Sequence, residues 1–254
     1  MTTSTAPVRV PQARFPGQAA APAGPVDLLP MYLMHHAFRR DLAAFATAAA
    51  GTAVEDRRRW RALARRWGQF ARVLHLHHAG EDEILWPLLL DRVDAAGDRA
   101  GRATLEAMEA EHEEIDPLLA GCAEGLDRLA AGADADTRAA LVVRLAATGE
   151  RLGHHLGHEE SDAMALVQQH LSPGDWAALH PRFAEHYTPQ DALFSLPWVL
   201  HEVPADLRPR ALAFVGRGPT LVWRLLLRGP FSLREGRVFG RVPGRTVRQE
   251  RAGA

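Results

Sequence analysis

Apolar residues recur at helical spacing along most of this chain. From about residue 27 to residue 190 they fall three or four positions apart, and alternating stretches of β-branched residues are nearly absent. In the first such stretch the repeating positions are Leu33, Ala37, Leu42 and Phe45. This spacing places apolar side chains on one face of a helix, whereas a strand would need alternation. The pattern predicts an all-α fold.

The helical pattern divides into four long segments joined by short connections. Glycines at positions 51, 97 and 132 lie in these connections. Short loops between long helices favour antiparallel neighbours, so we expect an up-down antiparallel four-helix bundle. The four helices are predicted over residues 27–50, 54–90, 99–131 and 136–170.

Prolines mark the expected interruptions of these helices. A proline within a helix removes a backbone donor and clashes with the preceding turn. We therefore expect Pro87 to kink or end the second helix near Trp86, and Pro117 to interrupt the third. Ser172 followed by Pro173 is typical of the end of a helix and should stop the fourth.

The two flanks differ from the helical region in composition. Residues 1–26 are rich in proline, alanine and threonine and lack an apolar run, which predicts a disordered arm and not a secretory signal. Residues 171–254 contain one short helical stretch, over 175–186, and then many prolines and glycines. We expect a C-terminal extension of broken helices packed on the bundle, or a loosely ordered segment. The predicted parts are thus 1–26, 27–170 and 171–254.

The C-terminal part carries an uneven share of the charge. The 30 basic residues of the chain are all arginine, and the formal net charge is −1. From residue 203 onward 11 arginines stand against three acidic residues, a net of +8 (11 minus 3). An arginine-rich tail can contact nucleic acid, anionic lipid or an acidic face of its own domain. A solvated tail is the simplest interpretation, and we do not expect a nucleic-acid partner.

Composition also constrains the compartment and the types of ligand. Cys122 is the one cysteine, so an internal disulfide and a thiolate metal site are both excluded. The most apolar stretch, residues 211–227, contains Arg217, Pro219 and Arg224, so we expect no transmembrane segment. These features fit a reducing compartment, and we predict a cytoplasmic protein.

Histidines are concentrated in the four predicted helices, where acidic residues accompany them. His77 and Glu81 are four positions apart, as are His155 and Glu159, so each pair lies on one helical face. Helix bundles build paired-metal sites from such inward carboxylates and imidazoles. Imidazole and carboxylate without sulfur suit iron or manganese. Without a metal, burying these groups would cost several kcal/mol each.

Four segments of the sequence resemble the hemerythrin-like cation-binding family. They are MHHAFRRD (34–41), HHAGEDEILWP (77–87), EHEEI (111–115) and HLGHEE (155–160), and the resemblance covers about residues 27–170. It implies a non-haem di-iron centre, in which carboxylates and an oxo or hydroxo group bridge two iron ions. The metal ligands that it implies, with the two glutamates as bridges, are His35, His77, Glu81, His112, His155 and Glu159.

One position departs from the oxygen-carrying members of this family. They place a second histidine four residues after the third-helix ligand, where this chain has Asp116. The predicted site is therefore poorer in nitrogen, which argues against simple reversible carriage of oxygen. Asp116 would bind a metal, bind water or do neither. In the fourth helix, a competing register would use His154 with His158 as the i, i+4 pair.

Other polar residues near these positions have more ordinary interpretations. His75 lies about 200° around the helix from His77, at about 100° per residue, so it should face elsewhere. We interpret His78 and His158 as neighbours that orient the ligands. The acidic residues beside the ligands are interpreted as solvated or paired with arginine: Asp82, Glu83, Glu113, Glu114 and Glu160.

Such a centre supports three hypotheses about function. The leading one is binding or sensing of a small ligand, such as dioxygen or nitric oxide, at an open iron position. The alternative is an oxidase or oxygenase that activates oxygen or peroxide, with the C-terminal extension over a substrate pocket. Such an enzyme needs a pocket that is larger than a diatomic molecule requires, beside the metals and lined by C-terminal residues. In the third hypothesis the metal is structural and the arginine-rich tail binds a partner.

Overall fold

The computed structural model describes residues 9–240 of the chain. The regular secondary structure of these residues is all helical, and the extended pairing among them is limited to an isolated antiparallel bridge between Val10 and Gly24. The all-α prediction is confirmed. No helix in this part of the chain is long and apolar enough to cross a membrane. The start of the predicted arm, residues 1–8, and the end of the arginine-rich tail, residues 241–254, lie outside the described residues.

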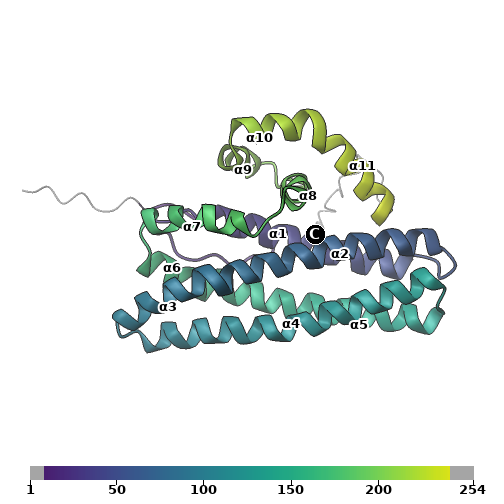
Figure 1. The fold of residues 1–254 in the computed structure, drawn as a ribbon, viewed down its shortest axis with the longest axis horizontal. Coiled ribbons are helices and arrows are strands. Elements are labelled where there is room, and N and C mark those ends of the chain that lie inside the picture. Colours follow the sequence, from purple (N-terminus) through teal and green to yellow (C-terminus); the bar gives the residue numbers. More distant parts are fainter. Residues whose placement is uncertain (1–8, 241–254) are drawn as a thin grey trace, which may run out of the picture.

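Four long helical segments lie side by side along the longest axis of the molecule (Figure 1). Two of them are single helices, α1 (Leu29–Gly51) and α4 (Arg99–Ala131). The other two each consist of an α-helix, a π-helical turn and a second α-helix. They are α2 (Arg57–Gly80), η1 (Glu81–Leu85) and α3 (Trp86–Ala95), and then α5 (Ala135–His158), η2 (Glu159–Ala163) and α6 (Met164–His170). α2 packs on α4, α4 on α5, and α5 on α1.

The two prolines predicted to interrupt these segments behave differently. Pro87 lies in the first turn of α3, directly after the π-helical turn, so the α-helical pattern is broken near Trp86 as predicted. The predicted interruption at Pro117 is wrong, because α4 continues through it to Ala131. Pro117 and Glu113 are both exposed, so the carbonyl group that loses its helical partner there is accessible to water.

Two apolar clusters fill the interior, and a polar layer separates them. In α1 the first cluster ends at Leu33 and the second begins at Ala37. In α4 the first cluster includes Met108 and the second begins at Ile115. The positions between them hold His35 and the histidine of α4, both buried. Burying imidazoles across the middle of an apolar core requires partners for their ring nitrogens.

Residues 9–26 differ from the prediction of a disordered arm. They form no helix, but their apolar side chains pack on the long helices, and Phe15 and Val26 are buried. The backbone N–H of Ala21 donates to the Tyr32 hydroxyl over 2.9 Å. A proline-rich composition prevents regular structure, yet a few apolar side chains suffice to hold such a segment against a core.

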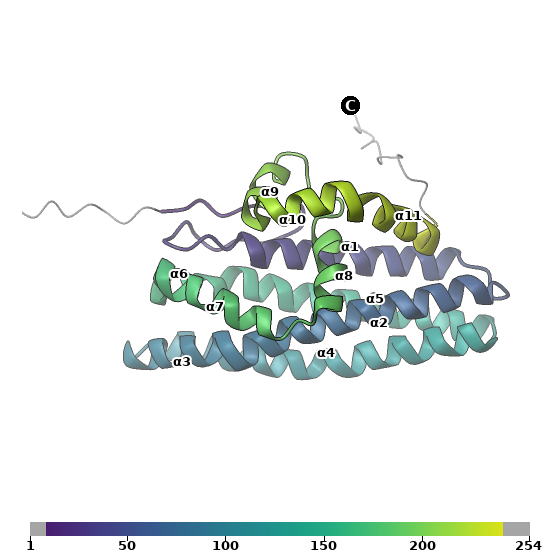
Figure 2. The ribbon, with the colours of Figure 1, turned by 45° about the horizontal axis from the view of Figure 1, so that its top comes forward.

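The C-terminal extension consists of short helices packed on α1 and α2 (Figures 1 and 2). They are α7 (Pro173–Glu185), α8 (Pro189–Val199), α9 (Arg208–Val215), α10 (Arg217–Val222), η3 (Trp223–Leu227) and α11 (Arg228–Phe239). For the described residues this matches the first of the two predicted forms, broken helices on the bundle.

A buried ionic cluster anchors this extension. Arg66 of α2 donates from Nε to Glu235 of α11 over 2.9 Å, and it also pairs with Asp41 of α1. The indole N–H of Trp198 in α8 donates to Asp41 over 2.8 Å. All four side chains are almost fully buried. Because an unpaired charge is costly in such a place, the cluster links α1, α2, α8 and α11.

Candidate metal centre

The six predicted ligands meet in the polar layer between the two apolar clusters. Ligand atoms there form two groups, and within each group the atoms lie within 4.8 Å of one another. The first group consists of His35, His77, Glu81 and Glu159, and the second of His78, His112 and His155. His78 is the one member that is not among the ligands predicted from the sequence.

The imidazoles of the first group face carboxylates at short distances. His35 Nε2 lies 3.2 Å from Glu159 Oε2, and His77 Nε2 lies 3.1 Å from Glu81 Oε1. The two Nε2 atoms are 3.2 Å from each other. Four potential ligand atoms thus converge on one small volume, from α1, α2, η1 and η2.

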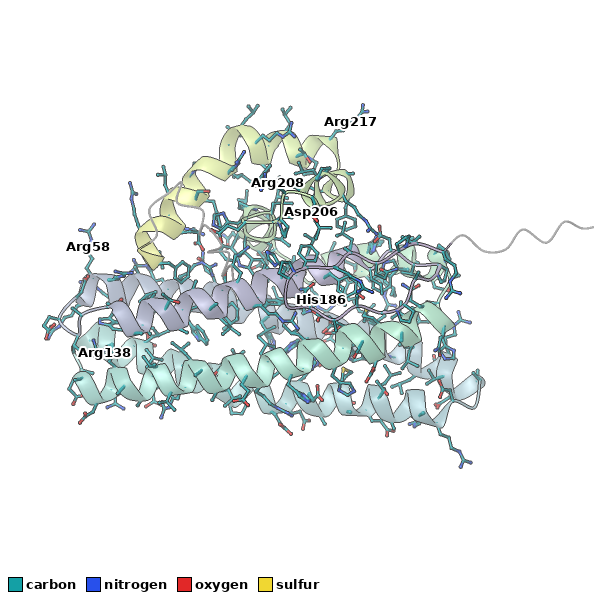
Figure 3. The ribbon with its side chains drawn as sticks, turned by 180° about the vertical axis from the view of Figure 1, so that it is seen from behind. Arg58, Arg138, His186, Asp206, Arg208 and Arg217 are labelled. Carbon is teal, nitrogen blue, oxygen red and sulfur yellow. The ribbon has the colours of Figure 1, made fainter. Side chains whose placement is uncertain are left out.

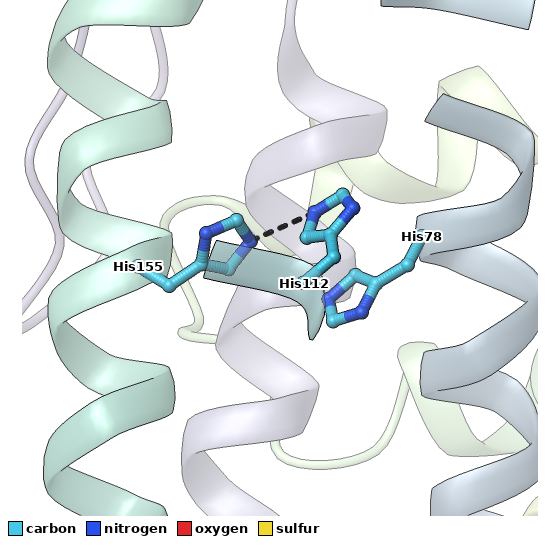
Figure 4. Close-up of side chains that lie close together, drawn as sticks. All are labelled: His78, His112 and His155. Carbon is cyan, nitrogen blue, oxygen red and sulfur yellow. Dashed lines mark hydrogen bonds between the residues drawn. The ribbon is translucent and has the colours of Figure 1, made fainter. Parts of the chain in front are cut away.

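The second group is built in the same way from α2, α4 and α5. The Nε2 atoms of His112 and His155 are 3.2 Å apart (Figure 4). The ring of His78 stacks on that of His112, with 3.9 Å between the centroids. Three imidazoles and no carboxylate belong to this group, so it is the richer of the two in nitrogen.

Two glutamates of the first group also reach towards the second. Glu81 directs Oε1 to His77, while its Oε2 lies 3.7 Å from His112 Nε2. Glu159 Oε2 lies 3.2 Å from His35 Nε2 and 3.9 Å from His155 Nε2. Each carboxylate therefore lies between the two groups, which is the position that a bridging ligand occupies.

The carboxylate oxygens at this centre lack hydrogen bonds. Both oxygens of Glu81, both of Glu159 and Nε2 of His78 are buried and have no hydrogen-bond partner among the described residues. Their contacts with histidines are close enough for ion pairs but are not aligned as hydrogen bonds. Leaving several buried polar atoms unsatisfied costs a few kcal/mol each. Cations coordinated by these atoms would satisfy all of them, so the residue set fits a metal centre.

Carboxylates outside the two groups contact the Nδ1 atoms of three of the imidazoles. Glu160 lies 2.9 Å from Nδ1 of His35, and a second acidic residue, Asp82, lies 2.8 Å from Nδ1 of His112. Glu111 lies 2.9 Å from Nδ1 of His155. An imidazole that donates from Nδ1 presents a lone pair at Nε2, which is the form that binds metals. These contacts orient the three imidazole rings so that their Nε2 atoms point towards the centre.

The hemerythrin HHE cation-binding domain model matches residues 30–167 of the chain. The chain belongs to this family. A search of curated proteins and a search of solved structures gave no match. The matched range includes every member of both ligand groups, lies within the four long segments and ends before α7.

Two π-helical turns of the hemerythrin domain begin at the glutamates that lie between the two groups. η1 starts at Glu81 and η2 at Glu159, and each closes with a backbone hydrogen bond from a residue five positions later. A π-turn widens the helix by one residue and often marks a functional site. It allows neighbouring acidic residues to reach different targets. Glu81 reaches the centre while Asp82 binds His112, and Glu159 reaches the centre while Glu160 binds His35.

The members of the first ligand group have pKa values shifted in opposite directions. Burial opposes charge on His35, but Glu159 and Glu160 outweigh it and raise the pKa of His35 to about 9. Burial, with His35 nearby, lowers the pKa of His77 to about 3. Burial and the charge of Glu159 raise the pKa of Glu81 well above its usual value. Burial opposes charge on Glu159, but His35 outweighs it and lowers the pKa of Glu159 to about 2. His35 therefore holds a proton at neutral pH, and the protonated form of Glu81 is favoured, so cations would compete with protons for these atoms.

Several expectations for neighbouring residues need correction. The competing register is wrong, because His154 is exposed and His158 binds Glu111 instead, with 3.0 Å from its Nδ1 to Oε1. Asp116 is exposed and belongs to neither group. His75 is exposed, as predicted.

The expectation of a nitrogen-poor site also changes. His78 places a fifth imidazole in the hemerythrin domain's centre, where the sequence suggested a neighbour that orients the ligands. Asp82 and Glu160 are not simply solvated or paired with arginine. Asp82 binds a histidine of the centre, and Glu160 binds His35 while also pairing with Arg39. The consecutive acids four and five positions after His77 and after His155 were the available signal, but only the π-turns show that both members of each pair can point inwards.

A cavity of about 220 Å³ adjoins the first ligand group. His77 and Glu81 form part of its wall, and Met31 and Met34 of α1 form another part. Its remaining walls come largely from the extension, with Trp176, His180, Phe183, Tyr187 and Phe214. These five residues lie beyond the range matched by the family, so the cavity combines the hemerythrin domain with the C-terminal helices of this chain.

Proposed function

We propose that the two ligand groups hold two non-haem iron ions, with Glu81 and Glu159 as bridging carboxylates. His35 and His77 would bind one ion, and the three imidazoles of the second group would bind the other. Three features support this assignment: the family match, the orphaned carboxylate oxygens, and a ligand set of nitrogen and oxygen without sulfur, which suits iron. The described arrangement also supports our interpretation of the four segments as an up-down antiparallel bundle.

We further propose that this centre binds a small ligand such as dioxygen or nitric oxide. The observation that carries this proposal is the unequal supply of imidazoles, two in the first group and three in the second. If both carboxylates bridge the two ions, the first ion would have fewer protein ligands than the second and would keep a coordination position open. His77 and Glu81 of that group line the cavity, which gives a ligand a place to bind. A ferrous pair, when bound, supplies electrons to a diatomic ligand.

The protein's own residues would prepare that position. Glu160 and Glu159 orient His35, and the surrounding apolar clusters exclude bulk water from the centre. Exclusion of water strengthens electrostatic interactions at the open position. His77, neutral because its pKa is about 3, is free to bind metal at neutral pH.

A second candidate function is an oxygen- or peroxide-activating oxidase or oxygenase. The cavity favours it, because a volume of about 220 Å³ is more than a diatomic ligand needs and its walls include C-terminal residues. The third hypothesis, a structural metal with a tail that binds a partner, predicts that neither ion has an open position. The three-part division of the chain and a cytoplasmic location remain predictions.

Optical spectroscopy of the iron-loaded, reduced protein tests the proposed function. Two irons per chain and an immediate absorption change with one equivalent of dioxygen or nitric oxide, without an organic co-substrate, are expected. A change that appears only while an organic molecule is consumed would favour the oxidase or oxygenase. Two bound irons with no spectral response to either gas would contradict both functions.

A further inference from the structure

The cavity beside the first ligand group has walls that suit an organic molecule. At about 220 Å³ it exceeds the roughly 150 Å³ of an engineered protein cavity that binds benzene. Its apolar lining includes Met31, Met34, Trp176, Phe183 and Phe214. Such walls bind ligands through burial of apolar surface and give little compensation to a ligand's charge.

Phe183 lines the cavity and packs on the helix that carries His77. A methyl group placed on Gly80 would lie 2.8 Å from the Phe183 ring, so the ring rests directly on the backbone of α2. Gly80 immediately precedes Glu81, and this contact therefore places a residue of α7 against the backbone beside a proposed ligand position. Residues of the extension thus line the cavity and contact the hemerythrin domain directly.

Tyr187 supplies a hydroxyl group in this mainly apolar wall, whose other polar members are His77, Glu81 and His180. Its side chain is half-buried, and its hydroxyl makes no hydrogen bond to any residue that the structure describes. Burial raises the pKa of Tyr187 above its usual value. The hydroxyl therefore keeps its proton at neutral pH and can donate it in a hydrogen bond.

We propose that this cavity binds a neutral, mainly apolar organic molecule with one hydrogen-bond acceptor, to which the Tyr187 hydroxyl donates. The inference deepens the proposed function and rests on it, because such a molecule would lie beside the open position of the first ion. Tyr187 would act as a positioning residue that sets which end of the molecule faces Glu81.

Calorimetric titration with three matched probes tests this proposal. Acetophenone is aromatic and has a carbonyl acceptor, ethylbenzene has nearly the same shape without it, and benzoate is an anion. We expect acetophenone to bind about 2- to 12-fold more tightly than ethylbenzene, the factor for one neutral hydrogen bond. Benzoate should not bind the metal-free protein. Tyr187→Phe should abolish the preference for acetophenone, and Phe214→Ala should weaken both neutral probes, whereas Leu193→Ala on the exposed face of α8 should change nothing.

Iron content measured in the same samples separates this inference from the proposed function. Protein with two irons per chain that binds neither neutral probe would overturn the cavity proposal alone. Protein that binds acetophenone but takes up no iron would overturn the proposed function alone. Equal preference for acetophenone in Tyr187→Phe and in the unaltered protein would overturn the role of Tyr187.

A separate observation concerns the outer face of the last helices. α10, η3 and α11 form the outermost layer of the extension (Figure 2). The side chain of Arg217 points away from the long segments (Figure 3). Large apolar side chains are exposed on the same face, with exposed fractions of 58 % for Leu221, 71 % for Leu225 and 65 % for Leu226. Three such leucines within two turns exceed what scattered surface residues explain.

Three exposed arginines accompany these leucines in α10, η3 and the start of α11: Arg217, Arg224 and Arg228. No salt bridge joins any of them to a described carboxylate. Arg234, further along α11, lies over the rings of Phe194 and Phe231 instead. The one acidic residue between positions 217 and 240, Glu235, is buried against Arg66. The face is therefore both apolar and strongly basic.

We infer that this face binds the surface of an anionic lipid membrane. Arginines alone would suit nucleic acid, but burying exposed leucines against phosphates brings no gain. Leucines alone would suit a second copy of the chain, but a copy would bring the same arginines face to face and repel them. A helix with apolar and basic side chains together lies in the membrane interface, with leucines in the acyl boundary and arginines at the headgroups.

Sedimentation with vesicles tests this second inference. The full chain should bind vesicles of phosphatidylcholine with 30 % phosphatidylglycerol at low salt, bind pure phosphatidylcholine weakly, and release at high salt. Arg224→Glu with Arg228→Glu, and separately Leu225→Ser with Leu226→Ser, should each reduce binding at least tenfold. The control is Arg61→Glu with Arg65→Glu, two exposed arginines of α2 with the same spacing, and this double variant should not reduce binding. Absence of vesicle binding, or a dimer in solution that the leucine pair abolishes, would overturn the inference.

Discussion

Glu81 and Glu159 occupy equivalent places in the two broken segments. Each is the first residue of a π-helical turn, and each directs its carboxylate between the two histidine groups. The residue after each one, Asp82 or Glu160, binds Nδ1 of a histidine on another helix. Each acidic pair thus provides one proposed bridge and one support for a ligand, which links the helix geometry to the chemistry of the centre.

His78 should be needed for the second metal ion. His78→Ala removes one of three imidazoles from that group, so we expect iron content to fall from two per chain towards one. His75→Ala, on the exposed face of the same helix, should leave two irons. Elemental analysis after gel filtration measures both, with helix content by circular dichroism as the control for folding. Unchanged iron content and affinity in His78→Ala would contradict the assignment of this residue.

Glu160 should tune the centre without being a ligand. In Glu160→Gln the charge beside His35 Nδ1 is lost, and residues in this role typically change metal affinity by about 10- to 100-fold. We expect that loss in a chelator-competition titration, with stoichiometry still near two at saturating iron. Glu113→Gln, an exposed acid next to a ligand position, serves as the matched control. An affinity equal to that of the unaltered protein would show that the contact has no such role.

The stability of the metal-free protein should fall as pH rises from 7 to 9. The pKa of His35 is raised to about 9, above its unfolded value, so its contribution is complete below that unfolded value and is lost through pH 9. The raised pKa of Glu81 acts in the same direction. Cation binding replaces these protons, so the iron-loaded protein should not show the fall.

Thermal unfolding at several pH values, with and without iron, measures this difference. The stabilisation by iron should grow between pH 7 and pH 9. The same slope with pH in both forms would contradict the placement of the protons, since it would mean that metal does not replace them.

Arg66 should be important for stability rather than for metal binding. With an exposed fraction of 1 %, it is paired with Asp41 and Glu235, and its removal leaves two buried carboxylates without a partner. Arg66→Met should lower the free energy of unfolding by about 3–5 kcal/mol. Arg65→Met, an exposed neighbour, should change it by no more than about 0.5 kcal/mol. Urea unfolding provides the comparison, and equal stabilities would refute the role of the buried cluster.

Much of the helical framework could be predicted from periodicity and capping residues. The third helix was expected over 99–131, and α4 has these bounds. Periodicity does not indicate where an α-helix changes locally to a π-helix. The π-turns at Glu81 and Glu159 depend on tertiary contacts, so the inward positions of Asp82 and Glu160 had no reliable sequence signal.

The candidate site was likewise predictable only in part from the sequence. The i, i+4 spacing of His77 with Glu81 and of His155 with Glu159 was enough to place these side chains together. His78 follows His77 by one position and therefore points about 100° away on an ideal helix. Only the packing of α2 against α4, which stacks its ring on His112, brings it into the second group. The walls of the cavity were likewise inaccessible to sequence reasoning, because they join residues from distant helices.

Anomalous diffraction at the iron edge, on crystals of the iron-loaded protein, tests the central claim most directly. We predict two peaks, one surrounded by His35 and His77 and the other by His78, His112 and His155, with Glu81 and Glu159 between them. A single peak, or iron bound only at surface carboxylates while these side chains remain bound to each other, would contradict it.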